Sequence, residues 1–393
     1  MTHHTPDPTT ISMALELLTE HGFERLSGAL EILFDEAMQL ERSAYLQAAP
    51  HERTDERRGH ANGFRAKKMK TRLGELSLRI PRVRGLDEGV EPFYPKALER
   101  GERSERALKL AVAQMYVEGV STRKVTAITQ ELCGLDITSS QVSRATALLD
   151  EEIEAWRNRE LGEYRYVILD ARYEKVRHGG RVLDCAVLLA IGVGVDGQRT
   201  VLGVSAALSE AEVHWRAFLE SLRDRGLFGM RLITSDDHSG LKAALRAVFP
   251  SIAWQRCQFH LQQNAQSYVP HIAMRKAVAQ EIRDVFNAPS RDEAERLLRL
   301  AVERRQKEAP DLARWMEENI PEGLAIFEVP AAHRRRLRTS NALERLNREI
   351  KRRTRVASLF PNEASLLRLV SAVAIEIAED WETGRTYLSM DAE

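Results

Sequence analysis

Residues 166–204, YVILDARYEKVRHGGRVLDCAVLLAIGVGVDGQRTVLGV, contain three runs with the character of buried β-strands. The runs are Tyr166–Leu169, which ends in Asp170, then Leu183–Val195, and finally Thr200–Val204. Short apolar runs that are bounded by turn residues and rich in Val, Ile and Leu are typical of strands with both faces covered. The stretch therefore predicts three consecutive strands of one sheet.

The segments that follow alternate between helical and strand patterns. We expect a helix at Glu210–Arg225, a strand at Met230–Thr234, a helix at His238–Phe249 and a strand at Ile252–Cys257. Three strands, a helix, a strand, a helix and a strand follow the order of a ribonuclease H-like core. The sequence therefore predicts an α/β protein whose core is a five-stranded mixed sheet with flanking helices.

The remaining segments divide around this core. A chain of 393 residues with 43% hydrophobic residues can bury the cores of two or three domains. We expect an N-terminal helical region at 1–50, a basic strand-containing segment at 51–103 with a strand at Leu76–Pro81, and a helix-turn-helix-like DNA-binding region at 104–160. The core is expected at 161–262. It is followed by an α-helical insertion at 263–335 and by C-terminal helices at 336–393 that complete the catalytic core.

Three short helices with tight turns occupy the region from Glu105 to about residue 160. The third begins at Thr138, whose hydroxyl forms a predicted capping box with Gln141. In a helix-turn-helix, Gln141 and Arg144 would lie near the exposed N-terminal end of this third helix, where side chains contact base edges and phosphates. A plain helical bundle is the structural alternative.

The charges are balanced overall but concentrated locally. The chain has 58 Lys and Arg and 58 Asp and Glu. Residues 51–85 contain 11 basic and 4 acidic residues, and residues 333–355 contain 10 basic and 2 acidic residues. Because phosphate contacts depend on local charge, both segments suit a polyanionic partner, although ordinary solvated faces can also be basic.

The cysteines and the hydropathy pattern indicate a cytoplasmic protein. Cys133, Cys185 and Cys257 are an odd number at wide spacing, which argues against a disulfide framework. No signal peptide and no run of about 18 apolar residues is recognisable, so no membrane partner is expected.

Three carboxylates occupy positions suited to a metal ion. Asp170 is predicted to end the first strand and Asp236 to follow the fourth, and these strands are neighbours at the centre of the predicted sheet. Glu344 would complete the site from a helical segment at about Ser340–Arg353. Carboxylates are the ligands that Mg²⁺ prefers, and a pair of such ions about 3.5–4 Å apart can cleave and join phosphodiesters.

A basic track follows Glu344 along the same helix. Positions i+4, i+7, i+8 and i+11 from Glu344 share its face, and they are Arg348, Lys351, Arg352 and Arg355. A metal ligand followed by cations suits a site where metal ions and DNA phosphates meet.

Four blocks of this sequence resemble the signature blocks of Mutator-type bacterial insertion-sequence transposases, and the similarity covers essentially the whole chain. The blocks are ILDARYEKVR (168–177), ITSDDHSGLKAAL (233–245), WQRCQFHLQQN (254–264) and RTSNALERLNREIKRRTRV (338–356). The resemblance implies a DDE transposase with a ribonuclease H-like domain split by a helical insertion. It also implies recognition of terminal inverted repeats, strand cleavage, and joining of the 3′-OH to target DNA.

Carried over residue by residue, the resemblance implies a triad of Asp170, Asp236 and Glu344 that holds Mg²⁺, for which Mn²⁺ can substitute. The second block more often has Asp-Gly-His where this chain has Asp236-Asp237-His238, and the strand end favours Asp236 as the ligand. Because a transposase must bring two double-stranded DNA ends together, we expect a homodimer or a higher assembly on DNA.

Three further residues have possible supporting roles. Cys257 and His260 form a C-x-x-H pair that is half of a zinc site, for which His178 and His238 are the candidate partners. The family motif favours instead a role for His260 in orienting DNA or an active-site carboxylate. Trp215 could stack on a flipped base, or it could be buried between helix and sheet.

Two other functions are compatible with parts of the sequence. A junction resolvase or a retroviral-type integrase shares the expected fold, but the helical insertion before Glu344 disfavours both. A DNA-binding regulator descended from a transposase would lack catalysis, and the presence of all three carboxylates argues against it.

Overall fold

The computed structural model of the chain describes residues 8–86, 90–96, 98, 100, 103–357 and 359–390. The chain forms two compact units, residues 1–149 and residues 150–393. Each unit has its own buried core and is described by itself. None of the described helices combines the length and the apolar character needed to span a bilayer.

The second unit is built on a mixed sheet. Its strands are β3 (Gly162–His178), β4 (Arg181–Gly194), β5 (Arg199–Ala207), β6 (Leu227–Phe228), β7 (Leu232–Ser235) and β8 (Ala253–Arg256). The main path has the order β5-β4-β3-β7-β8, and β6 pairs with the start of β3. The first three strands are antiparallel, and β7 and β8 continue in parallel. The five expected strands are therefore present, and β6 is an addition.

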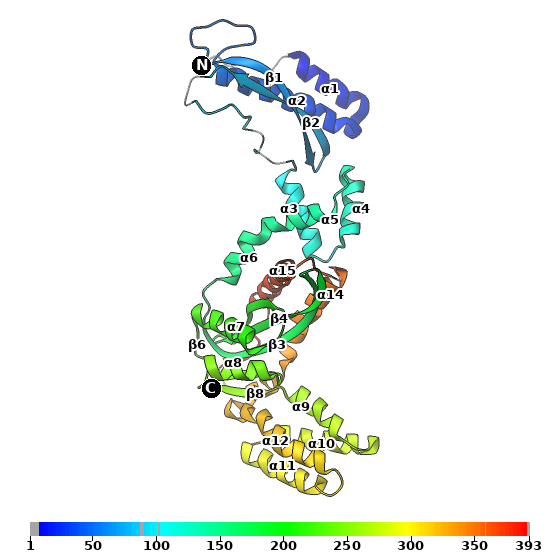
Figure 1. Cartoon of the computed structure of the whole chain (residues 1–393), viewed down its shortest axis with the longest axis vertical. Coiled ribbons are helices and arrows are strands. Elements are labelled where there is room, and N and C mark those ends of the chain that lie inside the picture. The colour runs from blue at the N-terminus through cyan, green and yellow to red at the C-terminus, as the bar shows by residue number, and fades with distance from the viewer. Residues whose placement is uncertain are drawn as a thin grey trace. The chain divides into compact units, whose positions relative to one another are not determined.

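Helices cover both faces of this sheet. On one face, α7 (Glu212–Asp224) and α8 (Ser239–Val248) lie side by side and share an apolar core with β3 and β4 (Figure 1). Strand residues that point to the opposite face of the sheet, such as Ile168, are also fully buried. Helix α15 (Glu363–Glu382) packs against β5 and β3. Burial on both faces explains why β4 is apolar from Cys185 to Gly194.

The described residues from 263 to 335, where the insertion is expected, form helices and contain no strand. After α9 (Gln258–Ala265) come α10 (Arg275–Phe286), α11 (Arg291–Arg305), α12 (Pro310–Asn319) and α13 (Ala331–Leu337). Figure 1 shows α10, α11 and α12 as a lobe beside the sheet, and this lobe has an apolar core of its own.

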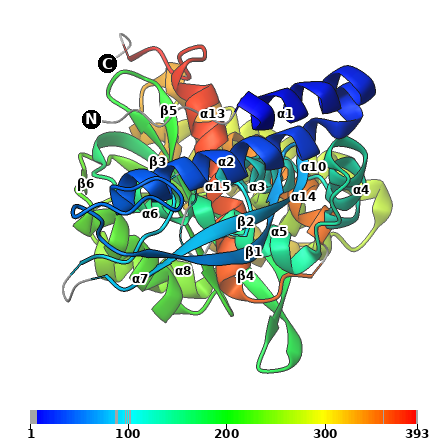
Figure 2. The same cartoon turned by 90° about the horizontal axis from the view of Figure 1, so that it is seen from above.

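The first unit begins with two helices and a two-stranded hairpin. Its elements are α1 (Pro8–His21), α2 (Leu26–Leu46), β1 (His60–Thr71), β2 (Gly74–Arg84), α3 (Arg106–Val117), α4 (Thr122–Cys133) and α5 (Ser139–Thr146). Helix α2 packs on β2 through Met38, Leu76 and Leu78 (Figure 2). The strand expected at Leu76–Pro81 is part of β2. Its partner β1 was missed because Gly, Lys and Arg hide its alternation.

The C-terminal segment folds back onto the sheet. After α13 come η7 (Ser340–Leu343), α14 (Glu344–Ala357) and α15. The backbone N–H groups of Tyr387 and Leu388 then donate hydrogen bonds of 3.0 Å to the carbonyl of Gly197. Gly197 lies in the turn between β4 and β5. Gly197 has a φ of +76°, and a Cβ there would lie 1.9 Å from the carbonyl oxygen of Leu388. Only glycine allows this contact.

Gly197→Ala should therefore release the C-terminal tail. We expect the free energy of unfolding to fall by about 2–4 kcal/mol, and the amides of Tyr387 and Leu388 to exchange hydrogen faster. Gly179→Ala is the control, because Gly179 has a φ of +54° with open space around it, and it should cost only about 1 kcal/mol. Equal losses in both variants, with no change in exchange, would contradict the docking of the tail.

Candidate active site

Asp170 and Asp236 occupy equivalent positions in the parallel register of β3 and β7. Ile168 pairs with Thr234, so each aspartate lies two residues beyond the last pair on its own strand. The prediction that Asp170 ends its strand was wrong, since β3 continues to His178 in pairing with β4. The pairing of β3 with β7, in contrast, ends two residues before Asp170. Beyond that point β3 has no strand partner on the β7 side among the described residues, and we call this part of the sheet, where the two carboxylates lie, the open edge.

The carboxylate of Asp170 is held at this edge with its charge poorly solvated. Burial and the neighbouring charge of Asp236 raise the pKa of Asp170 to about 6. Two hydrogen bonds act in the opposite direction. Asn347 Nδ2 donates to Oδ2 over 2.6 Å, and the backbone N–H of Ala171 donates to Oδ1 over 2.9 Å. A divalent cation would relieve the repulsion between the two aspartates.

Asp236 also contacts His260, the second residue of the C-x-x-H pair. Nδ1 of His260 forms an ion pair with Oδ1 of Asp236, and this hydrogen bond, together with one to Cys257, raises the pKa of His260 to about 10. The imidazole is therefore a cation that orients the Asp236 carboxylate. Ligand atoms of Asp236, Cys257 and His260 lie within 4.8 Å of one another, and a metal ion could bind this trio only after His260 loses its proton.

Cys257 links the trio to the segment that precedes Glu344. Its buried sulfur accepts hydrogen bonds from the backbone N–H and the hydroxyl of Ser340, at 3.4 and 3.5 Å. Burial raises the pKa of the Cys257 thiol, but the hydrogen bonds from His260 and Ser340 outweigh burial and lower it. The histidines considered as zinc partners lie elsewhere, since His178 pairs with Glu363 and His238 lies 3.8 Å from Glu210.

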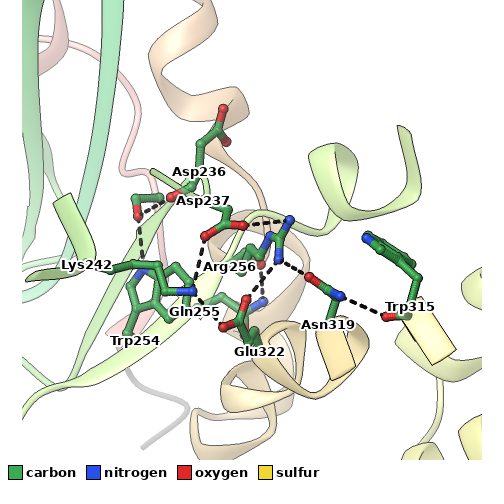
Figure 3. A network of polar contacts seen from close by, with 10 residues as sticks. Asp236, Asp237, Lys242, Trp254, Gln255, Arg256, Trp315, Asn319 and Glu322 are labelled. Carbon is green, nitrogen blue, oxygen red and sulfur yellow. Dashed lines mark hydrogen bonds and ion pairs between the residues drawn. The ribbon is translucent and has the colours of Figure 1, made fainter. Parts of the chain in front are cut away.

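Asp237 points into a different set of contacts from Asp236 (Figure 3). Its carboxylate lies 3.1 Å from Lys242 Nζ and 3.0 Å from the guanidinium of Arg256, which is only 3% exposed. Arg256 also contacts Glu322 at 2.9 Å. Asp237 thus balances the buried Arg256 and the partly exposed Lys242, and Asp236 is the carboxylate of this Asp-Asp pair that faces Asp170.

Glu344 begins α14, and this helix is attached directly to β3. Asn347, one turn after Glu344 on the same face, is the residue that binds Asp170. Arg172 of β3 donates to the backbone carbonyl of Asn347, and Glu174 accepts a hydrogen bond of 3.0 Å from Thr354. Glu344 is exposed and has no ion pair among the residues that the structure describes. Asn347 was missed, although it stands in the block that contains Glu344.

The other candidate residues have different environments. Trp215 is 0% exposed and packs beside Phe218 in the core, so burial, and not base stacking, describes it. Gln141 uses its carboxamide oxygen to accept a 2.9 Å hydrogen bond from the Thr138 N–H, and Arg144 is exposed. The four residues of the predicted basic track of α14 are exposed as well, namely Arg348, Lys351, Arg352 and Arg355, whereas Arg353 of the same helix is buried.

Comparison with known proteins places the chain in a family. The family model described as "Transposase, Mutator family" matches residues 9–384. The chain belongs to the Mutator family of transposases. A Burkholderia multivorans relative, "Transposase for insertion sequence element IS406", is 55% identical over 97% of both chains. A Staphylococcus aureus relative, "Transposase for insertion sequence element IS256 in transposon Tn4001", is 35% identical over 92% of both chains.

One more Mutator-family relative and one solved structure complete the comparison. A Mycobacterium tuberculosis relative, "Transposase for insertion sequence element IS1081", is 34% identical over 97% of this chain and 91% of its own length. The solved structure is a chain from the simian T-cell lymphotropic virus intasome in complex with PP2A regulatory subunit B56 gamma. It aligns with 43% of this chain and 70% of its own length, at 11% identity and a TM-score of 0.17, which is too low to bear on the fold.

The raised pKa of Asp170 gives this Mutator-family protein a testable pH dependence. Because the folded pKa, about 6, exceeds the unfolded value of about 3.9, the stability of the metal-free wild type should fall as pH rises through that window. Asp170→Asn should be more stable by about 1–3 kcal/mol above about pH 7, with no difference below about pH 4.

Thermal unfolding across pH, without and with Mg²⁺, measures both effects. A Mg²⁺ ion bound by the native carboxylate would stabilise the wild type and leave the variant unchanged. Asp184→Asn is the control, because Asp184 is exposed and pairs with Lys175 outside the site. If Asp170→Asn were no more stable than wild type at neutral pH, burial and the charge of Asp236 would not destabilise the ionised carboxylate of Asp170.

Proposed function

We propose that this protein is a DNA transposase in which Asp170, Asp236 and Glu344 hold Mg²⁺, with Mn²⁺ as a substitute. Its reactions are the hydrolytic cleavage of DNA strands and the joining of 3′-hydroxyl ends to DNA by transesterification. The observation that carries the proposal is the level position of Asp170 and Asp236 at an open sheet edge, beside the helix that begins with Glu344. The strand order supports a ribonuclease H-like core.

The residues at this edge fit a divalent ion. Two close carboxylates have one cationic partner, His260, and a third carboxylate lies on the helix bound to Asp170. When bound, the metal would activate the attacking water or 3′-hydroxyl and stabilise the leaving oxygen. The chain's own residues set the geometry: Asn347 orients Asp170, His260 orients Asp236, and Arg172 fixes α14 on β3.

The substrate in this proposal is double-stranded DNA, both the terminal inverted repeats of the element and the target. The exposed basic track of α14 follows Glu344 and would contact backbone phosphates near the metal. In the first unit, α3, α4 and α5 would form the helix-turn-helix, with Arg144 exposed on α5. Two ends must be held at once, so the active form would be at least a dimer on DNA.

A strand-transfer assay tests the chemistry. With labelled element-end duplexes, a target plasmid and Mg²⁺ or Mn²⁺, wild type should give joined products, and Asp170→Asn, Asp236→Asn and Glu344→Gln should give none. Asp237→Asn is the matched control, because that carboxylate faces Arg256 and Lys242, and its folded fraction should still join DNA.

Two outcomes of this assay would change the proposal. Products from Asp236→Asn but not from Asp237→Asn would mean that Asp237, and not Asp236, is the metal ligand. Specific binding of the ends by wild type and Glu344→Gln, with joining by neither, would favour a DNA-binding regulator.

Base contacts and phosphate contacts should respond differently to substitution. Arg144→Gln should change the preference among end sequences, because a lost base contact costs about 1–3 kcal/mol at one position. Lys351→Gln should weaken binding to all duplexes about equally, because a phosphate contact carries no sequence information. Binding to a panel of single-base variants of the end duplex measures both. A uniform loss in Arg144→Gln would mean that α5 does not contact bases.

A further inference from the structure

A pocket of about 460 Å³ lies in the second unit where β5, α13, η7 and the C-terminal tail meet. Its lining residues are Arg199, Arg335, Arg336, Thr339, Asn341, Ala342 and Tyr387. Three are arginines and none is acidic. We call this site the arginine pocket, and it shares no residue with the carboxylates or with the basic track of α14.

The positive charge of the arginine pocket is not neutralised within the part of the chain that the structure describes. Neither Arg199 nor Arg335 nor Arg336 has an ion pair with a described carboxylate, whereas the nearby Arg345 pairs with Asp380 at 2.7 Å. Burial lowers the pKa of Arg199, and the charges of Arg345 and Arg336 lower it further. Cations held together in this way favour an anionic ligand.

Aromatic rings hold the arginines in place. The guanidinium of Arg199 lies 4.1 Å from the ring centroid of Trp381 and 4.8 Å from that of Tyr387. Arg336 lies 5.1 Å from the same Tyr387 ring. The tail that carries Tyr387 is in turn hydrogen-bonded to Gly197. Such stacking fixes the donors before a ligand arrives, which reduces the entropy lost on binding.

The donors of the pocket match a phosphate. Guanidinium groups present paired N–H donors that fit phosphate oxygens, and the hydroxyl of Thr339 and the carboxamide of Asn341 add neutral donors. Asn341 lies three residues before Glu344, so an anion in the pocket would be close along the chain to the candidate metal site. We propose that the arginine pocket binds a backbone phosphate of the DNA substrate. This inference rests on the proposed function.

Salt-dependent DNA binding by the full chain tests the pocket. The variants are Arg335→Gln, Arg336→Gln and Arg199→Gln, and the first two residues are exposed, so their replacement should leave folding intact. The control is Arg216→Gln, an exposed arginine of α7 that pairs with Glu212. Each pocket variant should lower the log–log slope of affinity against salt by up to about 0.9, the value for one phosphate contact, which is up to about eightfold weaker binding at 0.1 M salt. The control should match wild type.

Each outcome bears on one proposal. Wild-type slopes in all three pocket variants would overturn the arginine pocket and leave the proposed function standing, whereas a wild type that does not bind duplex DNA would overturn the function itself. A tryptophan-fluorescence titration with inorganic pyrophosphate distinguishes a phosphate of the DNA backbone from a free phosphate as the ligand of the pocket. Pyrophosphate that binds wild type as tightly as DNA, and competes with it, would assign the pocket to a free phosphate and overturn the DNA assignment.

Discussion

The attachment of α14 to the outer part of β3 is the constraint on which the candidate site depends. Because pairing with β7 ends at Ile168, the next residues of β3 are available to another element. Asn347 binds Asp170 there, and Arg172 binds the Asn347 carbonyl. The helix that begins with Glu344 is thereby held beside the two aspartates, although the whole helical insertion separates it from them along the chain.

The insertion is part of this arrangement through a buried polar network. Arg256, at the end of β8, contacts Asp237 after β7 as well as Glu322 and Asn319 of the insertion. A buried guanidinium is costly unless its partners are present, so this network ties residues 319–322 to the sheet. The segment that returns toward Glu344 therefore starts from a fixed place.

Folding leaves charges of both signs uncompensated in the second unit. Asp170 has no ion pair among the described residues and is repelled by Asp236, which itself pairs with His260, and the arginine pocket holds cations that lack acidic partners in the described structure. Elsewhere the same chain pairs its charges, as Glu281 does with Arg304 and Arg305 at 2.7 Å. Uncompensated groups of this kind cost stability and are typical of sites completed by a metal and a substrate.

Local patterns were sufficient to predict the main strands, the helices between residues 263 and 335 and the Thr138–Gln141 capping box, because periodicity and caps depend on neighbours in sequence. They also placed Asp236 directly after its strand. Only the tertiary structure decided that Asp170 lies within β3, that His260 binds Asp236 and that Asn347 binds Asp170. The physical reason is that these contacts depend on where the pairing of β7 stops and on which distant segment fills the edge that it leaves.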